Sequence, residues 1–151
     1  MKYAQWPLQK DLMYKVQEPE KFEVLKLKTL QWYDGNWIWS LRMTLTDGSQ
    51  SKASVDFFES DCPQHSYTFK DNEEIRKVKI MMDDTSKWGL CGLIFVNDKG
   101  IEVVNIKGSL KGKWQTIDLE QGEQIVGFSY AACNKYNFMR GFGLITSKYT
   151  C

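Results

Sequence analysis

The chain has 151 residues, with 20 Lys and Arg against 19 Asp and Glu, and a formal net charge of +1. This length fits one domain, and the balanced charge argues against binding to nucleic acid or anionic membranes, which needs a basic excess on one face. An aromatic share of 14% and 11 Gly against 3 Pro, in a chain that is 42% hydrophobic, favour an ordered all-β protein.

The first predicted unit covers residues 22–73 and consists of β-prone runs separated by turn residues. Its first two runs flank a loop with the sequence Tyr33-Asp34-Gly35-Asn36, and Gly, Asn and Asp are residues that turns favour. Short apolar runs of this kind are typical of strands with one buried face. We expect four strands in two hairpins, at 22–29, 40–48, 53–58 and 67–69.

The second predicted unit covers residues 74–122 and repeats this order. Its loop has the sequence Asp83-Asp84-Thr85-Ser86-Lys87. The segment Lys107–Trp114 carries three lysines beside an aromatic residue but lacks the Walker pattern, so we interpret it as a basic hairpin tip. The four strands are expected at 74–80, 92–100, 103–106 and 114–119.

The third predicted unit begins at residue 123 and is interrupted at Cys151, where the glycines Gly48 and Gly100 of the other units would align. Its two strands are expected at 124–130 and 143–147, around the loop Asn134-Lys135-Tyr136-Asn137. Residues 1–21 match the missing half in length. We therefore expect the stretches Tyr3–Leu8 and Leu12–Val16 to complete the third unit.

The three units follow one another with a nearly constant period. Val24, Ile75 and Ile125 are separated by 51 and 50 residues. Such a period predicts three equivalent sheets around a pseudo-threefold axis, closed by the two ends of the chain so that few strand edges are exposed. No long stretch has apolar residues at helical spacing, so we expect almost no helix. The hypothesis is one all-β domain, 1–151.

Two stretches of sequence resemble the repeats of jacalin-related lectins. They are Gly92-Leu93-Ile94-Phe95-Val96-Asn97-Asp98-Lys99-Gly100, and Gly127-Phe128 followed by Gly141-Phe142-Gly143-Leu144-Ile145. The resemblance implies a β-prism I fold, with three four-stranded Greek-key sheets. It also implies carbohydrate binding through loops at one end of the prism.

The family's mannose-type site depends on a GxxxD motif that this chain does not have. Arg140 stands where the motif's aspartate is expected, and Tyr136 stands where its loop glycine is expected. The positions corresponding to that aspartate in the other two repeats are Gly89 and Trp37. The resemblance therefore indicates a divergent member, whose ligand contacts would come from other loop residues.

Candidate ligand-binding residues lie in the three loops that equivalent repeats would bring to one end. Acids and amides can exchange hydrogen bonds with sugar hydroxyls, and rings can stack on the apolar side of a pyranose. Ordinary solvated turns are the alternative interpretation of each loop. The candidates are Tyr33, Asp34, Asn36, Trp37, Asp84, Trp88, Asn134, Tyr136 and Arg140.

The sequence contains no pattern for catalysis, a cofactor or a metal site. The single histidine, in Cys62-Pro63-Gln64-His65, supplies with the cysteine only two potential ligands, too few to define a zinc site. The two adjacent acids Asp83 and Asp84 provide too few oxygens for calcium. No G-x-S-x-G motif is present. We therefore expect neither an enzyme nor a bound cofactor.

Cysteine usage and the N-terminus bear on the compartment. Cys62, Cys91, Cys133 and Cys151 form no C-x-x-C pair, which favours free thiols, with two disulfides as the alternative. The given N-terminus shows no apolar segment of a secretory signal, and no run is long enough for a membrane-spanning helix. These features predict an intracellular, cytoplasmic protein without membrane insertion.

Two hypotheses for function remain open. The first is a non-catalytic recognition domain that binds a glycan through the loops. The second is a structural or scaffold subunit that docks other proteins, as an oligomer or in a larger complex, without binding sugar.

Overall fold

Ten β-strands and no helix make up the part of the chain that the computed structural model describes. That part comprises residues 24–35, 37–53, 65–83, 89–109, 111–132 and 139–148. Within these residues, no helix is long and apolar enough to cross a membrane.

The first two sheets have the same antiparallel topology. One contains β1 (Leu27–Asp34), β2 (Ile38–Leu45), β3 (Gln50–Ala53) and β4 (His65–Thr68), in the order β3-β2-β1-β4. The other contains β5 (Ile75–Asp83), β6 (Leu90–Asn97), β7 (Glu102–Lys107) and β8 (Gly112–Asp118), in the order β7-β6-β5-β8.

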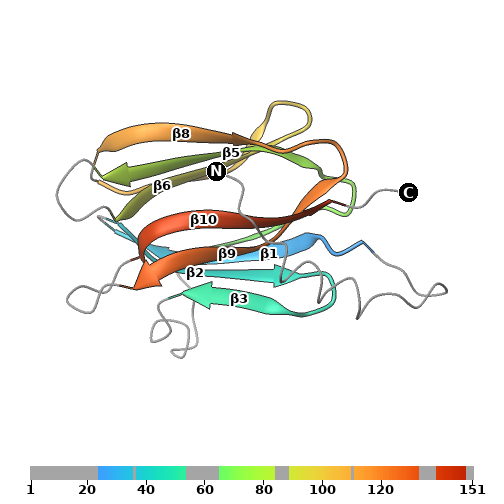
Figure 1. Ribbon diagram of the computed structural model, residues 1–151, viewed down its shortest axis with the longest axis horizontal. Helices are drawn as coiled ribbons and strands as arrows, with labels where there is room; N and C mark the ends of the chain where they lie inside the picture. The colour runs from blue at the N-terminus through green and yellow to red at the C-terminus, as the bar shows by residue number, and fades with distance from the viewer. Residues whose placement is uncertain are drawn as a thin grey trace.

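The third sheet is formed by the hairpin of β9 (Glu123–Ala132) and β10 (Met139–Lys148), the two of its strands that lie within the described residues. The predicted strands Tyr3–Leu8 and Leu12–Val16 lie outside the described residues. Figure 1 shows the strands of all three sheets running along the long axis of the molecule, so that their connections gather at its two ends.

The predicted arrangement in two hairpins is wrong. β1 and β5 each pair with the second and the fourth strand of their sheet, so the third and fourth strands lie on opposite edges. The order is the Greek key that the resemblance to jacalin-related lectins implied, and this part of the prediction is confirmed. β7 and β8 lie on opposite edges of their sheet, so the segment between them crosses over and is not a hairpin tip. Sequence proximity suggests neighbouring strands, whereas pairing is decided by which edges remain open after the first hairpin has formed.

Close contact at the start of β8 requires glycine. A Cβ added to Gly112 would lie 1.7 Å from the carbonyl oxygen of Met82. Any side chain there would therefore push the backbone of β8 away from β5, with which it pairs from Lys77–Asp118 to Asp83–Gly112.

Several strand boundaries differ from the predicted ones. β1 runs from Leu27 to Asp34, later than the predicted 22–29, because the rings of Trp32 and Tyr33 continue the strand instead of opening the loop. Asp83, predicted in a loop, ends β5. Beyond Ala53, most of the predicted strand 53–58 lies outside the described residues.

The inward faces of the three sheets share one hydrophobic core. Its fully buried members come from every sheet and include Leu30, Leu41, Leu93, Phe95 and Leu144. Aliphatic residues dominate, and the phenylalanines Phe69, Phe95 and Phe128 supply the buried rings. Burial of this shared surface is the main force that holds the sheets together.

The end opposite the β1–β2 turn is closed by matching turns, and we call it the base end; it comprises residues 46–49, 69–74, 98–101 and 119–122. Gly48 and Gly100 donate from their backbone N–H to Leu45 and Asn97 at 2.9 and 3.1 Å. Both glycines have positive φ, 88° and 78°, which explains why glycine recurs there.

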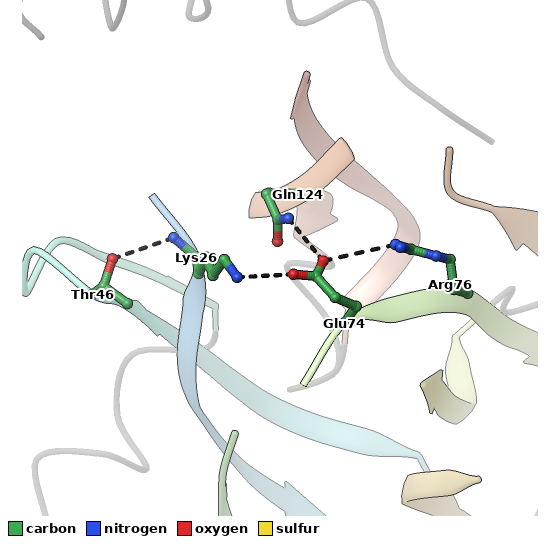
Figure 2. A network of polar contacts seen from close by, with 5 residues as sticks. All are labelled: Lys26, Thr46, Glu74, Arg76 and Gln124. Atoms are coloured by element: carbon green, nitrogen blue, oxygen red, sulfur yellow. Dashed lines mark hydrogen bonds and ion pairs between the residues drawn. The ribbon is translucent and has the colours of Figure 1, made fainter. Parts of the chain in front are cut away.

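Glu74 joins the three sheets at the base end (Figure 2). Lys26 Nζ, before β1, donates to Glu74 Oε1 at 2.8 Å, and Gln124 Nε2, in β9, donates to Oε2 at 3.0 Å. The Arg76 guanidinium lies 3.7 Å from the same carboxylate. Burial would by itself raise the pKa of Glu74, but these hydrogen bonds and charges outweigh it, so the pKa lies below its ordinary value.

The folded state favours the ionised form of Glu74. This residue should therefore make the free energy of unfolding depend on pH in the acidic range. Its contribution is fully present above the ordinary pKa of 4.5 and is lost as the pH falls through the lower folded-state pKa. We expect Glu74→Gln to lower the free energy of unfolding by roughly 1 kcal/mol at pH 7. The difference from the wild type should shrink towards pH 3. Melting temperatures of the two proteins across this range measure the difference, with exposed Asp118→Asn as the control. A difference independent of pH would contradict the prediction.

Candidate functional site

Strands β1, β5 and β9 end, and strands β2, β6 and β10 begin, at one end of the molecule, on the left of Figure 1. We call this the loop end; in the sequence, the segments that join these strands are 35–37, 84–89 and 133–138. The repeats predicted this gathering, because equivalent strands place equivalent loops at the same end. Of these residues, the structure describes Gly35, Trp37 and Gly89.

A buried aspartate connects the first two loops. Asp83 is 1% exposed, and its Oδ2 accepts a hydrogen bond from Trp37 Nε1 at 2.5 Å and from the backbone N–H of Gly89 at 3.2 Å. The Asp83 N–H donates to the carbonyl of Gly89 at 3.0 Å. Trp37 and Gly89 occupy the positions that align with the missing GxxxD aspartate in the first and second repeats. Asp83 holds both residues through these hydrogen bonds.

These bonds change the role expected for two residues. The predicted loop acid Asp83 is a structural residue, because its side chain is buried and bound to protein donors. The indole N–H of Trp37 is engaged by that carboxylate, so a ligand would meet the partly exposed ring rather than this donor. The carbonyl of Gly35 also accepts from the N–H of Ser109 at 3.3 Å, which fixes the β1–β2 turn against the crossover of the second sheet.

A second polar group lies beside the same turn. Oδ1 of Asp34 is 3.4 Å from Nε2 of His65, and the imidazole stacks on the Trp32 ring with centroids 5.5 Å apart. The β1–β4 pairing, which sets Trp32 opposite His65, produces this contact. The side chains of Asp34 and His65 are 24% and 45% exposed, so both are accessible to a ligand.

His65 is the residue that sequence reasoning missed. In the sequence it was considered only as a potential zinc ligand beside Cys62, and no local motif marks it as a ligand contact. Only the register of β4 on β1 brings it to Asp34, and that register depends on contacts between segments more than thirty residues apart. A carboxylate, an imidazole and an aromatic face are groups that can together recognise a hydroxyl-rich ligand.

The structure brings together Tyr33, Asp34 and Trp37 of the predicted site residues, all of them partly buried at the β1–β2 turn. Arg140 lies in β10, where its backbone pairs with Ala131. The remaining candidates lie outside the described residues, namely Asn36, Asp84, Trp88, Asn134 and Tyr136.

The residues that the structure describes contain no cluster of three or more His, Cys, Asp or Glu that could hold a metal ion. Cys91 is a free, buried thiol whose Sγ donates to the carbonyl of Met81 at 3.4 Å, as predicted for this cysteine. Cys62, Cys133 and Cys151 lie outside the described residues.

A cavity of about 370 Å³ opens at the base end, away from every predicted site residue. Leu27, Ile75 and Ile125, one from each sheet, contribute its apolar wall, and Lys28 and Lys70 are among its charged residues. No sequence motif marks it, because it forms where the three sheets converge.

No protein-family profile and no curated protein sequence matches the chain. Solved structures share its fold at low identity. A mannose-binding, jacalin-related lectin from Ananas comosus is 14% identical with a TM-score of 0.59, and the match covers 82% of this chain and 83% of the lectin. Wild-type Malaysian banana lectin is 16% identical with a TM-score of 0.60, over 82% of this chain and 84% of the lectin.

A lamprey immune protein is similar over part of its length. It is 17% identical with a TM-score of 0.60, and the match covers 82% of this chain but 38% of the lamprey protein, so this chain spans well under half of that molecule. Together with the all-β topology, these matches confirm the predicted fold: the chain adopts the β-prism of the jacalin-related lectins. A shared fold by itself does not define an activity.

Proposed function

We propose that this domain is a non-catalytic recognition module that binds carbohydrate at the loop end. The observation that carries the proposal is the accessible pair of Asp34 and His65 beside the Trp32 ring, at a turn that Asp83 and Ser109 hold in place. Because the turn is already held in place, few protein groups lose conformational freedom when a ligand binds. This lowers the entropic cost of binding a flexible ligand such as a sugar.

The chemistry of these groups supports a neutral, hydroxyl-rich ligand. The carboxylate of Asp34 accepts hydrogen bonds from hydroxyls, and the imidazole of His65 supplies both a donor and an acceptor when neutral. The Ananas comosus lectin of the same fold binds mannose, which makes mannose-type glycans the first class to test. Because GxxxD is missing, contacts through Asp34 would differ from the family's usual ones.

The test is a glycan array probed with and without calcium. We expect binding to mannose-type glycans that does not require calcium and that Asp34→Asn weakens roughly tenfold, because one acceptor becomes a donor of the same shape. Asp118→Asn, an exposed aspartate at the end of β8, is the matched control and should bind like the wild type.

Two outcomes would contradict the proposal. An array without any specific signal, accompanied by stable co-purification of the chain in a larger assembly, would favour the scaffold hypothesis. Equal binding by Asp34→Asn and the wild type, with unchanged melting temperatures, would place the sugar site elsewhere.

A further inference from the structure

The outer face of the second sheet carries an aromatic ring laid flat across its strands. Trp114 is in the edge strand β8, and a Cβ added to Gly92 of β6 would lie 2.6 Å from Cη2 of its ring. β5 separates these two strands, and adjacent strands are about 4.8 Å apart. The ring must therefore extend sideways over Met81 of β5 to reach Gly92.

The Trp114 ring covers Met81 and is itself partly open to solvent. Met81, which pairs with both Trp114 and Gly92, is only 7% exposed, whereas Trp114 itself is 39% exposed. The absence of a side chain at Gly92 leaves room for the ring to lie down. The result is an aromatic platform on the outer face of the sheet, partly exposed to solvent.

Cations surround the platform. Cross-strand pairing sets Lys107 of β7 beside Gly92, so Lys107, Gly92, Met81 and Trp114 form one row across the sheet. In the next row on the same face, Lys79 of β5 pairs with Thr116 of β8. No acid lies in these two rows, which otherwise contain Ile94 and Asn105. The next row on this face holds two acids: Glu102, 3.8 Å from the ammonium of Lys79, and Asp118, which pairs with Lys77.

The cationic surface continues along the sheet as a groove. A hollow of about 380 Å³ includes Lys79 and is also lined by Arg76, Lys77, Asp98 and Glu102. Nη1 of Arg76 is buried and forms no hydrogen bond to any described residue, its contact with Glu74 being a 3.7 Å ion pair. From the row of Trp114 to that of Lys77 is about 13 Å along the strands.

We propose that this face, from Trp114 to the Arg76 groove, is a second binding site, for an anionic oligosaccharide. One sugar ring stacks its apolar side on Trp114, and sulfate or carboxylate groups bind the ammonium groups of Lys107, Lys79 and Lys77. A saccharide fits better than single-stranded nucleic acid, which binds through successive stacked bases, because Trp114 is the one ring in the rows described above. The site is independent of the loop end and goes beyond the function proposed there.

The test is calorimetric titration of the whole chain with a heparin-derived tetrasaccharide. Its desulfated counterpart and an oligothymidylate are the comparison probes. We expect the sulfated tetrasaccharide to bind, and Trp114→Leu, which still covers Met81, to weaken binding roughly tenfold, about 1.4 kcal/mol. Lys107→Gln should weaken binding and flatten its salt dependence. Lys28→Gln, at the base end, should change neither.

Gly92→Ala provides a second variant that leaves the tryptophan in place. Its methyl group would lift the ring from the sheet, so weaker binding with a changed tryptophan fluorescence supports the proposal. No binding of the sulfated probe, equal binding by Trp114→Leu at an unchanged melting temperature, or tighter binding of the oligothymidylate would overturn it. Asp34→Asn should leave this binding unchanged, so failure here and failure at the loop end are distinguishable.

Discussion

Replacing Asp83 with alanine is expected to lower the free energy of unfolding by about 3 kcal/mol, because it leaves buried donors without their acceptor. The indole N–H of Trp37 and the N–H of Gly89 both donate to this carboxylate, which is 1% exposed. In a domain of this size the melting temperature should fall by roughly 6–12 °C. Urea unfolding followed by tryptophan fluorescence measures both quantities.

A double-mutant cycle separates the Trp37–Asp83 bond from other effects of the substitution. Trp37→Phe keeps a ring and removes the donor, so Asp83→Ala should cost less in its presence than in the wild type. Asp118→Ala, an exposed aspartate of the same sheet, should change stability by less than about 0.5 kcal/mol. Strictly additive effects of the two substitutions would show that the hydrogen bond does not hold the loops together.

Deleting residues 1–21 is expected to cost the domain most of its stability, about 5 kcal/mol or more. The first two sheets have four strands each, whereas the described part of the third has β9 and β10 alone. Isolated two-stranded sheets are marginally stable in water. Our prediction that Tyr3–Leu8 and Leu12–Val16 supply the other two strands makes the N-terminus part of the fold.

The shortened chain, 22–151, should unfold at lower urea concentration, and amide hydrogens of β9 and β10 should exchange faster than in the full chain. Adding a peptide of residues 1–21 should restore part of the lost stability, whereas a peptide of the same composition in scrambled order should not. A shortened chain as stable as the full one would refute the closure of the third sheet by the N-terminus.

Much of the architecture was predictable from local sequence, because periodicity and turn residues are local properties. The β-prism was predicted from the near-constant spacing of the units and from the family resemblance. Gly48 and Gly100 marked equivalent turns correctly, since only glycine adopts their positive φ without strain. The extent of β1 was predicted poorly, because turn propensity at Tyr33 and Asp34 competed with the β propensity of the rings beside them.

The candidate site was predicted in part. Tyr33, Asp34 and Trp37 were chosen for their chemistry and lie together at the loop end. Their partners could not be predicted, because Trp37 and Asp83 are separated by 46 residues, and Asp34 meets His65 through strand register. Trp114 was interpreted within a hairpin tip, and only the Greek-key order placed its ring across a sheet face.

The sequence by itself determined that the chain is an all-β protein and predicted its three units, because hydrophobic periodicity, β propensity and turn chemistry are properties of individual residues and their immediate neighbours. Tertiary structure alone decided the register of the strands, that Asp83 is a buried link rather than a ligand contact, and that His65 and Trp114 are exposed to solvent beside polar partners. The physical reason is that burial and hydrogen-bond partnership depend on what packs against a residue, and here the partners come from distant parts of the chain.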